Sequence, residues 1–253
     1  MVTSRWSGGL STLIAFAGVA VLAFWAGQAE ASILIDDFAS TNWAGWPLHA
    51  TGAGSVTADE LGLASVIGGR RETSLSLPGV PDIPGLDEAT AEVFSGGGFS
   101  LADYASTTGA TGLLEFLYRG SAFGNANWDL SGETGIQVDF LAYDAPAGQS
   151  LKVQATLQDL DSGTLGTTTA YLTTGGPQTV LLTFAGLSGP VNLASVDVIT
   201  IGFSDAKAAD FRVDKVSAYV PEPATLALLG LGVAGFLARR RHRGDGQGMR
   251  EGD

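Results

Sequence analysis

The chain has 253 residues, no cysteine and a formal net charge of −13. The missing thiols exclude disulfides, a catalytic cysteine and a thiolate metal site. Between Ser32 and Tyr219 the charge is more negative, with 21 acidic against 7 basic side chains, or −14. Such a surface repels nucleic acid and anionic lipid, so we expect neither as a partner of this region.

Residues 1–31 have the features of a signal peptide. Arg5 supplies a positive first segment, residues 10–26 are apolar, and Ala29-Glu30-Ala31 places small residues at the cleavage positions. We predict a cut before Ser32. The exported part is then 32–219, a length that suits one domain with a full hydrophobic core.

The exported part reads as a series of short β-strands. The first expected strand is 33–35, and 61–67 with 70–77 is expected to form a hairpin around Gly68-Gly69. The proline-rich segment 78–86 is a loop. Further runs with alternating apolar residues are 91–94, 99–104, 112–118, 135–143, 151–157, 167–173, 179–184, 196–203 and 211–219.

About ten or eleven strands joined by Gly-rich turns, without helices between them, predict antiparallel pairing. We therefore expect an all-β fold, an antiparallel β-sandwich of the jelly-roll type. The opening Leu-Ile-Asp-Asp-Phe at 34–38, the hairpin at 68–70 and the closing 211–219 resemble the galactose-binding-like and carbohydrate-module sandwiches.

The sequence of the exported part shows none of the residue patterns that mark an enzyme active site. The exported part has one histidine, His49, and no nucleophile-elbow sequence. One histidine without cysteine cannot assemble a zinc site, and no pair of carboxylates is marked out for glycoside hydrolysis. We expect a protein that is not an enzyme.

The resemblance to galactose-binding-like sandwiches implies a different site, since their terminal strands often lie together with a structural ion between them. Asp36 and Asp37 follow the first strand, and Asp210 and Asp214 border the last. Four carboxylates meeting there would suit calcium. The alternative is that they are solvated turn acids without any cofactor. Two weaker candidates lie inside the chain, at Asn125-Ala-Asn127-Trp-Asp129 and at Asp159 with Asp161, the latter also fitting a plain hairpin turn.

Carbohydrate modules stack sugar rings on exposed aromatic side chains. Trp43, Trp46 and Trp128 lie in or beside predicted loops and are the candidates for such stacking. The competing interpretation is that each is half-buried at the edge of the core, with its N–H bonded locally.

The segment 220–243 has three parts in a fixed order. Pro221-Glu222-Pro223 breaks the preceding strand, residues 224–238 form an apolar run, and a basic cluster follows, containing Arg239, Arg240, Arg241 and Arg243. As a helix the apolar run would measure about 22 Å, against a bilayer core of about 30 Å. By the positive-inside rule the cluster and the tail 244–253 stay in the cytoplasm.

This order of parts resembles a PEP-CTERM sorting signal. The resemblance implies export, transient anchoring in the inner membrane by one transmembrane helix, and processing by an exosortase, a membrane-embedded protease or transpeptidase. The ordinary alternative is a permanent single-pass anchor. After processing, we expect the exported part to reach the cell surface or the extracellular matrix. For the exported domain two hypotheses compete: a structural, non-enzymatic matrix component, or a carbohydrate-binding module for exopolysaccharide, with a polysaccharide-active enzyme as a third.

Overall fold

The computed structural model describes residues 32–77, 88–96, 99–107, 110–120, 125–204 and 206–220. The segment from Ser32 to Val220 forms one compact unit. The predicted signal peptide, transmembrane helix and basic cluster lie outside the described residues, and no helix within the described ranges is long and apolar enough to cross a membrane.

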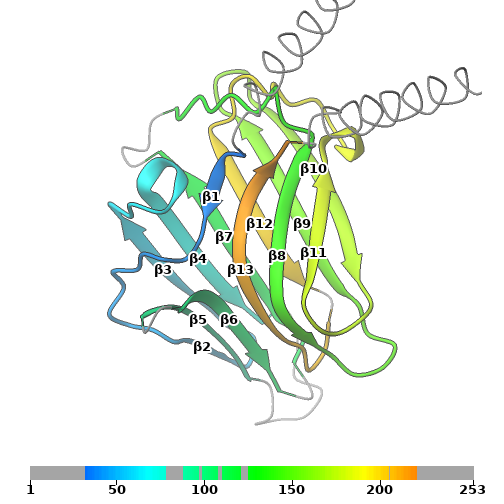
Figure 1. Cartoon of the computed structure of the whole chain (residues 1–253). Coiled ribbons are helices and arrows are strands. Elements are labelled where there is room, and N and C mark those ends of the chain that lie inside the picture. The colour runs from blue at the N-terminus through cyan, green and yellow to red at the C-terminus, as the bar shows by residue number, and fades with distance from the viewer. Residues whose placement is uncertain are drawn as a thin grey trace, which may run out of the picture. The chain divides into compact units, whose positions relative to one another are not determined.

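The described ranges contain thirteen strands and two short 3-10 turns, arranged in two stacked antiparallel sheets (Figure 1). The first sheet consists of β1 (Leu34–Asp36), β2 (Leu48–Thr51), β5 (Glu88–Gly96), β6 (Phe99–Ser106), β8 (Gly135–Asp144), β11 (Gln178–Thr183) and β13 (Asp210–Tyr219). The second consists of β3 (Ser55–Leu61), β4 (Arg70–Ser76), β7 (Leu113–Arg119), β9 (Leu151–Asp159), β10 (Thr164–Leu172) and β12 (Val198–Ser204). The predicted all-β, antiparallel β-sandwich is confirmed.

Strand order is not sequence order. The first sheet runs β11-β8-β13-β6-β5-β2, with β1 paired to β13, and the second runs β10-β9-β12-β7-β4-β3. The two terminal strands of the domain therefore lie side by side, as the sequence pattern suggested. Every strand pairing within the described ranges is antiparallel, which lets short turns connect strands without crossover helices.

The core forms where the inward faces of the two sheets meet. Alternation along β8 buries Ile136, Val138 and Phe140 while Gln137 and Asp139 face outward. Phe140 of the first sheet meets Phe203 of the second sheet edge-on, at 5.8 Å between ring centroids. Within the first sheet, Tyr104 stacks on its cross-strand neighbour Phe211 at 4.7 Å. Such packing contributes beyond the area it buries.

The first predicted hairpin is present but with different strands. We expected 61–67 to pair with 70–77; the strand that pairs with β4 is β3, Ser55–Leu61, and the 3-10 turn η1 (Ile67–Gly69) ends the connection between them. The prediction was wrong because β3 places a charged residue, Glu60, on its inner face, which breaks the expected apolar alternation. Gly62, at φ +73°, turns the chain out of the strand just where the prediction began one.

Candidate functional site

Gly202 lies in the middle of β12, which has a paired strand on each side. It stands opposite Glu115 of β7 and Gln154 of β9. Ile201 and Phe203 are buried in the core, so alternation places position 202 on the outer face of the second sheet. Because glycine has no side chain, the neighbouring side chains surround a gap.

A hollow of about 300 Å³ opens at this point. Its lining residues come from three adjacent central strands and the turn before β7: Thr111, Gly112, Leu113, Glu115, Lys152, Gln154, Gly202 and Ser204. A Cβ built at position 202 would lie 3.8 Å from Glu115 Cγ, an ordinary van der Waals distance. A larger side chain could thus occupy the hollow without displacing backbone.

The hollow offers both hydrogen-bond donors and acceptors. Lys152 supplies an ammonium group, Glu115 a carboxylate and Ser204 a hydroxyl, while Gln154 can donate and accept. Within the described ranges neither Lys152 nor Glu115 forms an ion pair, so both groups can bond a ligand. A hydroxyl group both donates and accepts hydrogen bonds, so these groups together can bond to a hydroxyl-rich molecule.

Polar side chains continue from the hollow across the whole sheet. The strand registers place one row of outward-facing positions side by side: Thr57, Ser74, Glu115, Gly202, Gln154 and Thr169. Tyr171, whose side chain is 61% exposed, stands opposite Lys152 at the edge of the hollow. The surface therefore joins an aromatic ring to a row of polar groups long enough for several units of a chain ligand.

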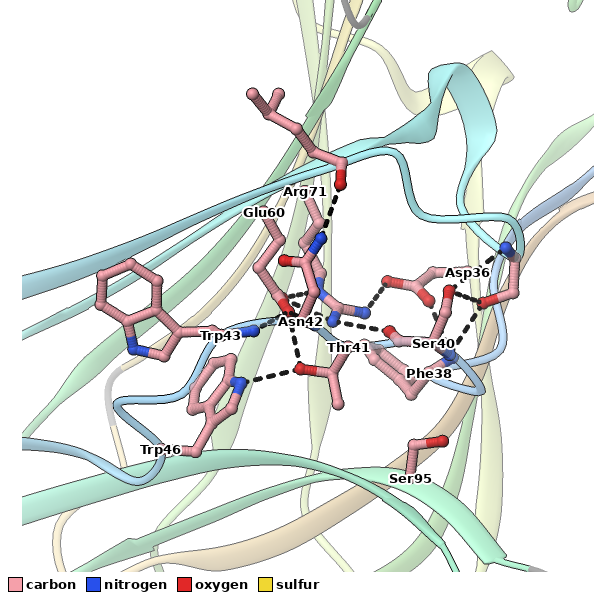
Figure 2. A network of polar contacts seen from close by, with 12 residues as sticks. Asp36, Phe38, Ser40, Thr41, Asn42, Trp43, Trp46, Glu60, Arg71 and Ser95 are labelled. Atoms are coloured by element: carbon pink, nitrogen blue, oxygen red, sulfur yellow. Dashed lines mark hydrogen bonds and ion pairs between the residues drawn. The ribbon is translucent and has the colours of Figure 1, made fainter.

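A separate, fully buried ionic network holds the loop that carries two tryptophans (Figure 2). Arg71 donates through Nη1 to Asp36 Oδ2 at 2.9 Å and through Nη2 to Glu60 Oε2 at 2.6 Å. All three side chains are 0% exposed. The network has one cation for two carboxylates, so its charges balance only if one carboxylate is protonated.

Burial raises the pKa of Asp36 to about 6, although Arg71 opposes this shift. Burial also acts to raise the pKa of Glu60, but the Arg71 charge and hydrogen bonds from the loop outweigh it and hold that pKa below its ordinary value. Glu60 Oε1 accepts from Thr41 Oγ1 at 2.6 Å and from the Asn42 backbone N–H at 2.8 Å. As the pH falls, Asp36 is therefore the first of the two carboxylates in the network to take up a proton.

The predicted calcium site at the terminal strands is not formed. Asp36 is bonded to Arg71, and Asp37 accepts from the Ala39 backbone N–H at 2.9 Å. Asp210 begins β13, whereas Asp36 lies opposite Val216, six residues further along, or about 20 Å at strand rise. Asp214 sits between, at a register shift of β13. The terminal strands are adjacent, but the carboxylates do not converge.

The structure instead brings together the two weaker candidates. Carboxylate oxygens of Asp159, Asp161 and Asp197 lie within 4.8 Å of one another. Asn125 donates its side-chain amide to Asp161, and Asp197 Oδ1 accepts from the Asn127 backbone N–H at 3.0 Å. Oxygen ligands in this number could hold a hard cation. Asp197 was missed because it is more than thirty residues from the other two; calcium binding stays a prediction.

The three tryptophans predicted to stack on sugars do not form a row. Trp46 is half-buried and donates Nε1–H to Thr41 Oγ1 at 2.9 Å. Trp128 is also half-buried, in a backbone bridge with Val196, and Trp43 alone is exposed, at 37%. The interpretation of tryptophans at the core edge is the correct one for Trp46 and Trp128. His49 lies exposed beside Glu88, at 3.6 Å.

Residues 220–241 match the PEP-CTERM protein-sorting motif, which confirms that this segment is a sorting signal and implies export to the cell surface. No curated protein matches the chain. Among solved structures, the sandwich is similar to CtCBM11, at 13% identity and TM-score 0.44, over 77% of this chain and 98% of that one.

It is also similar to a family 11 carbohydrate-binding module from Clostridium thermocellum in complex with a β-1,3-1,4-mixed-linked tetrasaccharide, at 14% identity and TM-score 0.37, over 75% and 95% of the two chains. A third similar structure is a cellulose-specific module, CBM28, at 12% identity and TM-score 0.37, over 51% and 79%. At these values no residue role is transferred from them.

Proposed function

We propose that this protein is an exported, non-enzymatic carbohydrate-binding protein that binds a neutral polysaccharide on the outer face of its second sheet. The observation that carries the proposal is the hollow at Gly202, with donors and acceptors on its walls and exposed Tyr171 paired with the lining residue Lys152. One sugar unit would stack on Tyr171 and bond to Lys152 opposite it. The next units of the chain would bond to Gln154 and Glu115 further across the sheet. The formal charge of −14 on the exported part favours a neutral chain over an acidic one.

We further propose that an exosortase-type membrane protease or transpeptidase processes the sorting motif and releases the domain to the cell surface or the extracellular matrix. The match over 220–241 supports this step. Transient anchoring by residues 224–238 before the cut belongs to the same proposal. The sorting motif thus directs the protein, and the sandwich provides the binding.

The test is affinity electrophoresis of the exported domain through native gels that contain a neutral polysaccharide, with mixed-linkage β-glucan, hydroxyethyl cellulose and galactomannan as the probes. At least one probe should retard the wild-type domain. Gly202→Val should abolish the retardation, because its side chain fills the hollow at an ordinary contact distance from Glu115 and leaves the fold intact.

Ala142→Val is the matched control, because Ala142 is a small residue on the opposite face of the sandwich, on β8. It should migrate as the wild type does in every gel. Equal migration of wild type and Gly202→Val in all three polysaccharides would contradict the proposal.

A structural matrix role without a discrete sugar site is the second candidate. The half-buried state of Trp46 and Trp128 favours it, because both rings pack against the core and offer less surface to a sugar. A protein of this kind would pass through all the gels without specific retardation.

A further inference from the structure

The last strand of the domain is paired to its final residue. Tyr219 lies opposite Gly135 of β8, and its carbonyl accepts from the Thr134 backbone N–H at 2.9 Å and from Thr134 Oγ1 at 3.3 Å. Val216, Ser217 and Ala218 before it are buried. The end of β13 is thus a fixed part of the first sheet.

The first strand of the domain covers the other side of the same end. β1 pairs with β13 so that Leu34 lies opposite Ser217, and the Ala218 backbone N–H donates to the Ile33 carbonyl at 2.8 Å. Asp36, the last residue of β1, is bonded to the buried Arg71. Because β13 has a partner on each side here, releasing its end breaks two ladders at once.

The sorting motif begins at the residue after this strand. The match starts at Val220, and Pro221 is only two residues beyond Tyr219. Two extended residues reach at most about 7 Å. A protease binds its substrate as an extended, unpaired chain, commonly by adding it to a strand of its own. The backbone just before the motif is already hydrogen-bonded to β1 and β8, so it is not free to bind a protease.

We propose that the end of β13 must separate from β1 and β8 before the chain can be processed at the sorting motif. We call the pairing of β1 with β13, where Leu34 lies opposite Ser217 and Asp36 opposite Val216, the seam. Opening of the seam then governs the rate of release. This rests on the proposed processing of the motif. When opening and closing are fast relative to cleavage, the rate of processing follows the population of the open seam. The folded domain with a closed seam is the retained form.

The experiment inserts Gly-Ser-Gly-Ser between Tyr219 and Val220 of the full chain, in a host that has an exosortase. The inserted residues supply unpaired backbone without opening the seam. Pulse–chase labelling should show processing accelerated by roughly tenfold. The reason is that the protease can bind the unpaired spacer in every molecule, and no longer only in the few whose seam is open. The control carries the same four residues in the turn between Ala147 and Gly148, which joins β8 to β9, and should be processed at the wild-type rate.

Equal rates for the two insertions would overturn the inference. Both chains are also made with alanine at 221–223, which separates the two proposals. If the cut does not depend on 221–223, the proposed processing fails, and the inference fails with it. If the cut depends on 221–223 but the spacer brings no acceleration, the processing stands and only the role of the seam is refuted.

Discussion

Asp36 makes the stability of this domain depend on pH in an unusual direction. Its carboxyl is 0% exposed, and its pKa is raised from 3.8 to about 6. For an acid whose pKa is higher in the folded state, the ionised form opposes folding and the protonated form does not. The contribution of Asp36 is therefore fully present below pH 3.8 and is lost as the pH rises through 6.

The magnitude follows from the two pKa values. The rise in the pKa of Asp36 from 3.8 to about 6 corresponds to about 3 kcal/mol over the full titration. Between pH 7 and pH 5, linkage gives a gain of roughly 1 kcal/mol in the free energy of unfolding. Glu60 does not obscure this window, because its pKa lies below 4.5 and its contribution is lost only at lower pH.

The assay is urea unfolding of the exported domain and of Asp36→Asn at pH 7 and pH 5. Carboxylates outside the network titrate alike in both proteins, and Glu60 titrates below this pH window, so the difference between the two free energies reports on Asp36. On acidification from pH 7 to pH 5, we expect the wild type to gain roughly 1 kcal/mol in the free energy of unfolding relative to Asp36→Asn. A difference that is constant with pH, or that shifts toward Asp36→Asn, would refute the account of the network.

Three further predictions concern folding and sorting. Val138→Asp should abolish cooperative unfolding, followed by circular dichroism, because it buries an unpaired charge, whereas Leu141→Asp on the outer face should fold. Arg71→Met should lower the free energy of unfolding by about 3–5 kcal/mol in urea, because two buried carboxylates lose their cation. Alanine at 221–223 should leave an uncut, membrane-retained chain; mass spectrometry that finds normal processing would contradict the role of the motif.

The fold was predictable because most strands alternate cleanly. β8 shows this best, since Ile136, Val138 and Phe140 point inward and polar residues separate them. The prediction failed where a polar residue faces the core. Glu60 occupies an inner position of β3, where burial of an unpaired carboxylate would be costly. Its ion pair with Arg71 offsets this cost, but the two side chains meet only when the chain folds.

The candidate site was less accessible to sequence reasoning than the sorting motif. Residues 220–223 are contiguous, so their order could be read directly. The hollow depends on pairing between strands far apart in the chain, which places Glu115 and Gln154 on either side of Gly202. The available signal was a glycine inside an apolar strand, which often marks a place where something approaches the backbone closely.

Backbone amide chemical shifts, followed while a neutral oligosaccharide of the retarding polysaccharide is titrated into the exported domain, test the central claim most directly. The largest shifts should fall on Glu115, Lys152, Gln154, Gly202 and Ser204, which line the hollow of the second sheet. Amides of β13 and β8 in the first sheet should hardly move. Shifts that gather on the first sheet, or that spread evenly over both, would contradict the claim that this face binds the sugar.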